Sequence, residues 1–153
     1  MNVGVVPLET LKSHDGASFL TKIMEGELPL PPIMDALGFH PHVVEEGRVV
    51  FTGMPEHRHY NPIGSVHAGF ALTLLDSCVA CAVHSSCKRG EGYTTLELKS
   101  NFVRPLTEKT GPVFADGRVV FRGRRTATAE GTLKDETGKL YAHASTTCLI
   151  FDL

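Results

Sequence analysis

The sequence has 153 residues, of which 42% are hydrophobic and 21% are charged, and its formal net charge is −2. This length is typical of one globular domain that holds a core without a metal or a disulfide. The net charge lacks the basic excess of a typical nucleic-acid-binding protein. No apolar run reaches the ~18 residues that a membrane span needs, because Asp76 interrupts the longest candidate.

The first 34 residues are expected to form an N-terminal helix and a lead-in segment. Residues 16–25 have the pattern of a short helix, which Asp15 is placed to cap. Three prolines between residues 29 and 32 then interrupt regular structure. We therefore divide the chain into a lead-in of residues 1–34 and a main domain of residues 35–153.

The main domain is predicted to contain one long helix among six strands. Residues 66–84 are the most apolar part of the chain and are assigned to the helix. Short turns join most of the strands, which indicates an antiparallel sheet. A long antiparallel sheet with one apolar helix has to wrap round that helix to bury it, so the fold class is α+β. The predicted strands span residues 40–46, 48–54, 95–103, 112–123, 126–134 and 139–151.

Alternation of apolar and polar residues assigns a buried face to the later strands. The polar residues between the apolar ones, such as Lys99 and Arg122, are expected to point the other way. The residues expected on the buried face are Leu96, Leu98 and Phe102 in residues 95–103, and Val113, Ala115, Val119 and Phe121 in residues 112–123.

One acidic residue stands out in the predicted helix. Asp76 is the only side chain between Ala68 and Val83 that is charged at neutral pH. Burial disfavours the charged form of a carboxylate, so Asp76 needs a partner, a water-filled cleft or a chemical role. Two interpretations remain open: a structural contact, from helix to sheet or between subunits, and a nucleophile or general base.

The segment before this helix is suited to binding a negatively charged oxygen. Gly64 and Gly69 allow a ligand to approach the backbone closely, and the first turn of a helix exposes unpaired N–H groups. Ala68, in that turn, precedes Asp76 by eight residues, which is about 12 Å along a helix axis. If both act on one carbonyl group, they come from antiparallel helices of two subunits. This mechanism therefore predicts a homodimer with two composite sites.

Several short motifs follow one another along the main domain. They are Asn61, Gly64, His67-Ala68-Gly69 and Asp76, followed by residues 101–105, 117–127 and 135–144. Together they resemble the hotdog-fold acyl-CoA thioesterases of the phenylacetic-acid-degradation (PaaI-like) group, over about residues 35–150. The resemblance implies the hotdog fold, a long antiparallel sheet wrapped round one central apolar helix, here preceded by a short N-terminal helix.

The resemblance also implies hydrolysis of an acyl- or arylacyl-CoA to the free acid and coenzyme A. Asp76 would be the nucleophile or the general base, and the N–H of Ala68 would polarise the thioester carbonyl. Asn61 and His67 would orient the carbonyl or the attacking water. No metal and no cofactor is implied, since coenzyme A is part of the substrate. The family commonly has glycine where this chain has Ala68, and alanine keeps the N–H group.

Further residues are assigned to the same site. A hydroxyl early in the next strand often assists the carboxylate in this group, and the candidates are Thr94 and Thr95, with Thr95 preferred. Gly69 and Leu72 lie on the same helical stripe as Asp76 and are expected to contact the substrate.

Coenzyme A carries phosphates, so arginines are expected along its path. An ordinary solvated charge on a strand is the alternative explanation for each of them. The candidates are Arg104, Arg122, Arg124 and Arg125.

Two other functions remain open: a non-catalytic acyl-CoA-binding protein, and a hotdog enoyl-CoA hydratase or dehydratase. Only a thioesterase releases a free thiol from acyl-CoA: a binding protein leaves the thioester intact, and a hydratase adds water to the enoyl chain.

The pair Cys78 and Cys81 is interpreted as small buried thiols rather than a redox motif. The histidines at positions 40, 42, 57 and 59 lack the spacing of a zinc site.

The expected partners and location follow from the same observations. We expect a homodimer, or a dimer of dimers, that binds acyl-CoA and neither nucleic acid nor a membrane. The N-terminus lacks the pattern of a secretory signal, and three of the four cysteines cluster within ten residues, which favours a reducing cytoplasm.

Overall fold

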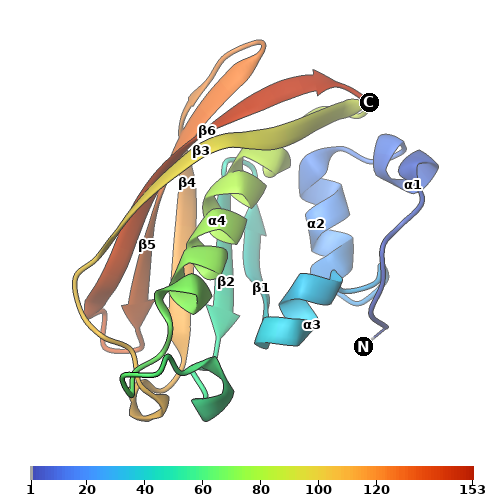
Figure 1. Cartoon of the computed structure of the whole chain (residues 1–153). Coiled ribbons are helices and arrows are strands. Elements are labelled where there is room, and N and C mark those ends of the chain that lie inside the picture. Colours follow the sequence, from blue (N-terminus) through green and yellow to red (C-terminus); the bar gives the residue numbers. More distant parts are fainter. Residues whose placement is uncertain (1) are drawn as a thin grey trace.

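The computed structural model describes residues 2–153, and its main feature is one antiparallel sheet curled round a long helix, α4, which spans Ala68–Ser85 (Figure 1). The six strands are β1 (Phe39–Glu45), β2 (Arg48–Gly53), β3 (Glu91–Phe102), β4 (Val113–Arg122), β5 (Thr126–Asp135) and β6 (Leu140–Asp152). Their order across the sheet is β1-β2-β4-β5-β6-β3, so β1 and β3 form its edges. This arrangement confirms the predicted α+β architecture of a sheet wrapped round a central helix.

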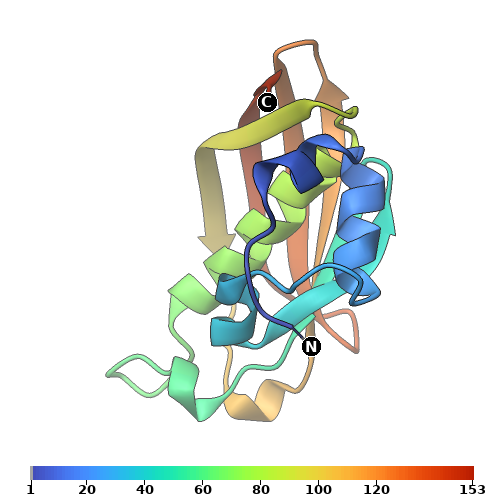
Figure 2. The same cartoon turned by 90° about the vertical axis from the view of Figure 1, so that its right-hand side faces the viewer.

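Three short helices precede the sheet and lie beside α4 on the side away from β5 and β6 (Figures 1 and 2). The helix predicted at residues 16–25 is confirmed as α2. The carboxylate of Asp15 caps this helix by accepting the N–H of Ser18 at 2.9 Å. The first helix was not predicted, because its five residues bury no side chain and so leave no periodic pattern. The division of the chain at residues 34 and 35 stays a prediction. The helices are α1 (Leu8–Lys12), α2 (Gly16–Met24) and α3 (Pro32–Leu37), and two 3-10 turns, η1 (His57–His59) and η2 (Glu108–Thr110), lie in later loops.

A pair of glycines lets α4 lie close against the sheet. Gly117 on β4 is opposite Gly131 on β5, and both are buried. A Cβ atom on Gly117 would overlap the backbone of Cys78, and one on Gly131 would lie 2.7 Å from Cγ1 of Val79. The two glycines therefore fix how deeply the middle of α4, including the turn that carries Asp76, sits in the sheet.

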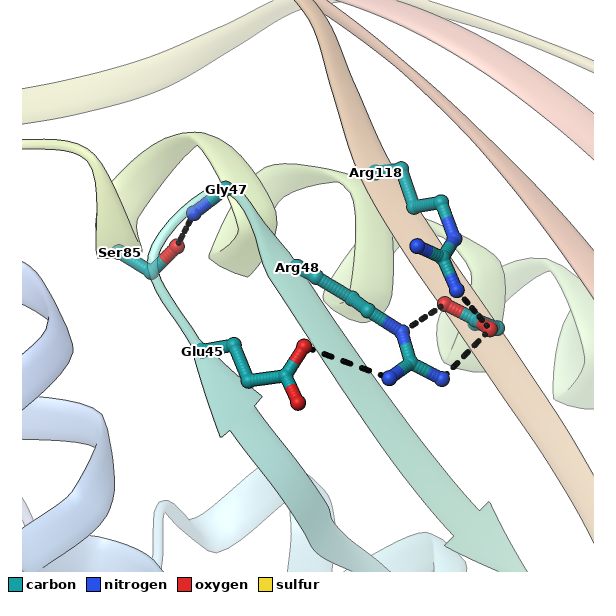
Figure 3. Close-up of polar contacts among 6 residues, drawn as sticks. Glu45, Gly47, Arg48, Ser85 and Arg118 are labelled. Carbon is teal, nitrogen blue, oxygen red and sulfur yellow. Dashed lines mark hydrogen bonds and ion pairs between the residues drawn. The ribbon is translucent and has the colours of Figure 1, made fainter.

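The C-terminal end of α4 is held by hydrogen bonds to the turn between β1 and β2 (Figure 3). The hydroxyl oxygen of Ser85 accepts the N–H of Gly47 at 2.8 Å and donates to the carbonyl of Ala82 at 2.7 Å. On the neighbouring strands, two nitrogens of Arg48 donate to the two carboxylate oxygens of Asp116, each at 3.1 Å. The bond from Gly47 ties the end of α4 to the sheet, and the Arg48–Asp116 pair joins β2 to β4 beside it.

Helix α4 is long and apolar enough to cross a membrane by length and composition alone. It has 18 residues with a mean hydropathy of 1.4, and 67% of it is buried inside the protein. Side chains such as Leu74, Leu75 and Val79 are fully buried. The apolar character of α4 is thus explained by the sheet that surrounds it.

Two β-bulges correct the predicted buried faces. One falls between Thr95 and Glu97 on β3, and the other between Val119 and Phe121 on β4. An extra residue in a strand turns the side chains that follow it to the other face. The prediction of burial is therefore wrong for Leu96 and Phe121, which are 56% and 63% exposed. It is also wrong for Phe102 at the end of β3, whereas Leu98, Val113 and Ala115 do pack against or within the core.

Candidate active site

Asp76 lies in the third turn of α4 and is half-buried. The hydroxyl of Thr95, on β3, donates to Oδ1 of Asp76 at 3.4 Å. Burial raises the pKa of the Asp76 carboxyl above its ordinary value, and the hydrogen bond from Thr95 opposes that rise. Within residues 2–153 no lysine, arginine or histidine forms an ion pair with this carboxylate. Asp76 is thus a carboxylate with a raised proton affinity and no neutralising cation.

Asp76 opens onto a cleft of about 580 Å³ between α4 and the N-terminal segment, which we call the N-terminal cleft. Thr94 and Thr95 lie beside Asp76 in its wall, and the remaining lining is mostly apolar. The carboxylate therefore faces a space that can hold a substrate, in addition to its bond to the sheet. The lining residues are Gly4, Val5, Val6, Leu11, Phe19, Leu20, Ile23, Pro29, Pro31, Ile33, Met34, Asp76, Ser77, Ala80, Cys81, His84, Tyr93, Thr94 and Thr95.

Asn61 shapes the loop that leads into α4. Its side-chain oxygen accepts the N–H groups of Ile63 and Ser65 at 3.0 and 3.2 Å. Its side-chain nitrogen donates to the hydroxyl of Ser65 at 3.0 Å. These bonds hold the loop in shape, and the role of Asn61 in orienting the carbonyl or the attacking water stays a prediction.

His67 caps the start of α4. Its Nδ1 accepts the N–H of Gly69 at 2.8 Å, and its carbonyl accepts the N–H of Phe70 at 3.0 Å. In its neutral form His67 then carries its proton on Nε2. The N–H of Ala68, the residue between His67 and Gly69, has no acceptor within residues 2–153. It is therefore available to a ligand at the start of α4.

The free N–H of Ala68 opens onto a second cleft of about 280 Å³, which we call the helix-start cleft. Asn61, His67 and Arg104 also line it. The two clefts share no residue, and Ala68 and Asp76 are separated by about 12 Å along α4. Within one chain, the carboxylate of Asp76 and the N–H of Ala68, which is predicted to bind the carbonyl, therefore do not meet in one site.

The four arginines predicted to bind phosphate do not form one cluster. Arg104 lies near the start of α4, where Nη1 donates to the carbonyl of Leu140 at 2.6 Å. The other three lie by the turn between β4 and β5, at the opposite end of the sheet (Figure 1). There Arg122 is half-buried and pairs with Glu91 at 2.7 Å, while Arg124 and Arg125 are exposed.

The structure adds a site residue that the sequence interpretation missed. His84 is buried in the last turn of α4 and lines the N-terminal cleft, which residues of α2 and α3 also line. A histidine on an otherwise apolar helix was a signal that could have singled it out. The contribution of α2 and α3 has no such signal, because it depends on how the N-terminal segment folds back over α4.

With this geometry in view, the sequence model of the Thioesterase superfamily matches residues 63–142. The chain belongs to the thioesterase superfamily. Among solved structures, a point variant of the phenylacetic acid degradation protein PaaI from Thermus thermophilus is 33% identical, with a TM-score of 0.69 over 77% of this chain and 97% of its own. A phenylacetic acid degradation-related protein from Ralstonia eutropha is 28% identical, with a TM-score of 0.77 over 86% and 98%.

The PaaI protein of Escherichia coli is 21% identical, with a TM-score of 0.76 over 89% of this thioesterase and 94% of its own chain, and shows the shared fold alone. No curated protein matches the sequence. The protein is therefore a PaaI-like hotdog thioesterase and a thioester hydrolase, as its motifs predicted.

The cysteines of this thioesterase are all free and buried. Burial raises the pKa of the Cys81 thiol to about 12 and that of Cys87 to about 11. Both are therefore protonated at neutral pH, and only the thiolate is an effective nucleophile. Neither thiol is therefore an effective nucleophile at neutral pH.

Proposed function

We propose that this thioesterase hydrolyses acyl-CoA thioesters at composite sites, each made from Asp76 of one subunit and the start of α4 of its partner. The observation that carries the proposal is the placement of two unsatisfied groups on one helix. Asp76 is half-buried without a cation, and the N–H of Ala68 lacks an acceptor within the described residues, about 12 Å away. Two antiparallel copies of α4 would bring one of each group together at two sites that a two-fold axis relates to each other.

In the proposed reaction, Asp76 removes a proton from water as the water oxygen attacks the thioester carbon. The negative charge that develops on the carbonyl oxygen is stabilised by the N–H of the partner's Ala68 at the positive end of its helix. The C–S bond then breaks, and the proton held by Asp76 passes to the coenzyme A sulfur. Because the raised pKa of Asp76 makes it a stronger base, its burial assists the first step. No cofactor beyond the coenzyme A of the substrate takes part.

Direct attack by the Asp76 carboxylate is the second route, and it forms a mixed anhydride that water then cleaves. A single turnover in water labelled with heavy oxygen tests for this route. Label in the Asp76 carboxylate requires an anhydride that water cleaves at the aspartyl carbon, whereas general-base catalysis places the label in the released acid alone.

The surface around Asp76 supports a dimer. Strand β3 is an edge strand, and Leu96, Phe102 and Val103 on or after it are 56%, 47% and 48% exposed. On α4 the neighbouring Leu72 is 36% exposed. An exposed edge strand with apolar side chains is a template for pairing with another chain. We propose that this face pairs with a second copy, and that two such dimers associate.

Coenzyme A phosphates are proposed to bind the arginines that form no ion pair within the described residues. Arg124 and Arg125 are exposed at the turn between β4 and β5, and Arg104 is exposed beside the helix-start cleft. Arg122 is committed to Glu91, so its contribution is to hold the turn that carries its two neighbours. The reaction is assigned to the cytoplasm.

Release of free thiol from a panel of acyl-CoA substrates tests the proposed function. Short, medium, long and aryl acyl groups are compared at equal concentration. Hydrolysis of at least one substrate with a turnover number above about 1 s⁻¹ supports the proposal. Tight binding without thiol release would instead favour an acyl-CoA-binding protein, and hydration of an enoyl-CoA would favour the hydratase.

The hydrogen bond from Thr95 to Asp76 predicts a change in pH dependence. In Thr95→Val the carboxylate loses a donor that stabilises its charged form, so the pKa of Asp76 rises further. The acidic limb of the kcat/KM profile is expected to move to higher pH, with a loss of about two- to tenfold at mildly acidic pH and little loss above neutrality. Thr95→Ser keeps the hydroxyl and is expected to retain the original profile. An unshifted limb in Thr95→Val would contradict this positioning role.

A further inference from the structure

We propose that the N-terminal cleft binds the acyl group, and that His84 at its far end selects chains of about eight to ten carbons that end in a neutral hydrogen-bonding group. This inference rests on the proposed acyl-CoA hydrolysis and specifies its substrate class. It is carried by the course of the cleft along α4 and by the environment of His84.

The cleft has reactive groups at one end and an apolar wall along its length. Asp76 and Thr95 mark the reactive end. Phe19, Leu20 and Ile23 of α2 and Met34 of α3 are buried and line the wall. Figure 2 shows the N-terminal segment and α1 crossing α4 on this side. Such a wall suits a hydrocarbon chain that starts at the carbonyl beside Asp76.

His84 is the polar exception in this wall. It is only 7% exposed, and its ring lies 5.5 Å from that of Phe19 and 4.8 Å from that of Tyr93, between centroids. Neither ring nitrogen of His84 makes a hydrogen bond within residues 2–153. Neither belongs to the fully enclosed polar atoms that lack a partner in this part of the chain, so neither nitrogen is sealed off. Because His84 lines this cleft and its ring nitrogens are not fully enclosed, we infer that a ligand in the cleft can reach them.

A ring nitrogen that is mostly shielded and has no partner within the described residues can gain binding energy from a ligand that supplies a hydrogen bond. Burial lowers the pKa of His84 to about 4, so the ring is neutral at pH 7 and offers one donor and one acceptor. The cleft contains no lysine or arginine among its lining residues. A carboxylate at the chain end would therefore be desolvated without a cation, whereas a hydroxyl or carbonyl group would be satisfied.

The spacing of Asp76 and His84 sets the length of the chain. They are eight residues apart on α4, which is about 12 Å along the helix axis. An extended hydrocarbon chain advances by about 1.25 Å for each carbon–carbon bond. About eight to ten carbons thus connect a thioester carbonyl at Asp76 with a terminal hydroxyl at His84.

The test compares decanoyl-CoA with ω-hydroxydecanoyl-CoA, and the corresponding free acids, on the purified full-length protein. The expected kcat/KM for the hydroxylated substrate exceeds that for decanoyl-CoA by about tenfold, and calorimetry is expected to give a similar ratio of Kd values for the free acids. In His84→Leu, which keeps an apolar side chain of comparable size, both ratios are expected to fall to about one or below. His84→Gln restores a donor and an acceptor and is expected to recover part of the preference.

His14→Leu is the matched control, because His14 also packs on Phe19, at 6.4 Å between ring centroids, but does not line the cleft. It should keep the wild-type ratios. Equal ratios in wild type and His84→Leu would overturn the role of His84, even if thioesters are hydrolysed. Failure of the proposed function would appear differently, as absence of thiol release from every substrate, and the binding of the free acids would still test the cleft.

Discussion

Asp76→Asn is expected to lower kcat for thioester hydrolysis by about 10²–10⁴-fold. The amide has nearly the same shape as the carboxylate but neither accepts a proton from water nor attacks a thioester. Because the side chain still fills the same space beside Thr95, affinity for acyl-CoA should change little. The measurements are thiol release for kcat and calorimetry for binding.

Asp35→Asn provides the control for this change. Asp35 lies on α3, is exposed and does not line the N-terminal cleft. Its substitution should leave kcat within about twofold, as expected of a surface change. If Asp76→Asn kept the wild-type kcat, the carboxylate would have a structural role through its hydrogen bond to Thr95, and the proposed catalytic role would be wrong.

Ala68→Pro is expected to lower kcat by about 10²–10³-fold, the cost of removing one donor to a developing oxyanion. Proline lacks the backbone N–H, and its fixed φ angle suits the first residue of a helix, where Ala68 stands. His67 has φ −58° and ψ 136°, a conformation that a residue before proline readily adopts. The variant should therefore fold normally and lose only the proposed donor.

Ala68→Gly is the matched control because it keeps the N–H and matches the residue common in the family. Its kcat is expected to stay within about threefold of wild type, with a small loss of stability from the more flexible glycine. Thermal unfolding of both variants checks the fold. A fully active Ala68→Pro with an unchanged Tm would show that this N–H does not bind the carbonyl oxygen.

The fold could be predicted in outline from the sequence. The apolar segment at α4 and the short turns between most of the strands each have local causes, and the structure places them as expected. The predicted buried face was wrong at Leu96 on β3 and after Val120 on β4, because a bulge depends on the partner strand as well as on the strand itself. For the same reason Arg122 turned inward to Glu91 instead of outward to solvent.

The candidate site was predictable where a residue type conflicts with its surroundings. Asp76 is an acid on an apolar helix, and of the two threonines considered beside it, Thr95 is the one that donates a hydrogen bond to its carboxylate. The position of His84 against Phe19 was not predictable, since it depends on the packing of α2 onto α4. The arginines were grouped by sequence distance, whereas the sheet separates Arg104 from the turn between β4 and β5.

Subunit complementation between Asp76→Asn and Ala68→Pro tests the composite site most directly. Each variant alone should be almost inactive, and the two are unfolded together, refolded as a mixture and assayed for thiol release. In a mixed dimer one site carries both substitutions and the other carries neither, so random pairing should restore about a quarter of the wild-type activity. A mixture that stays at the residual activity of the separate variants would show that Asp76 and Ala68 act within one chain or not at all, and would contradict the account.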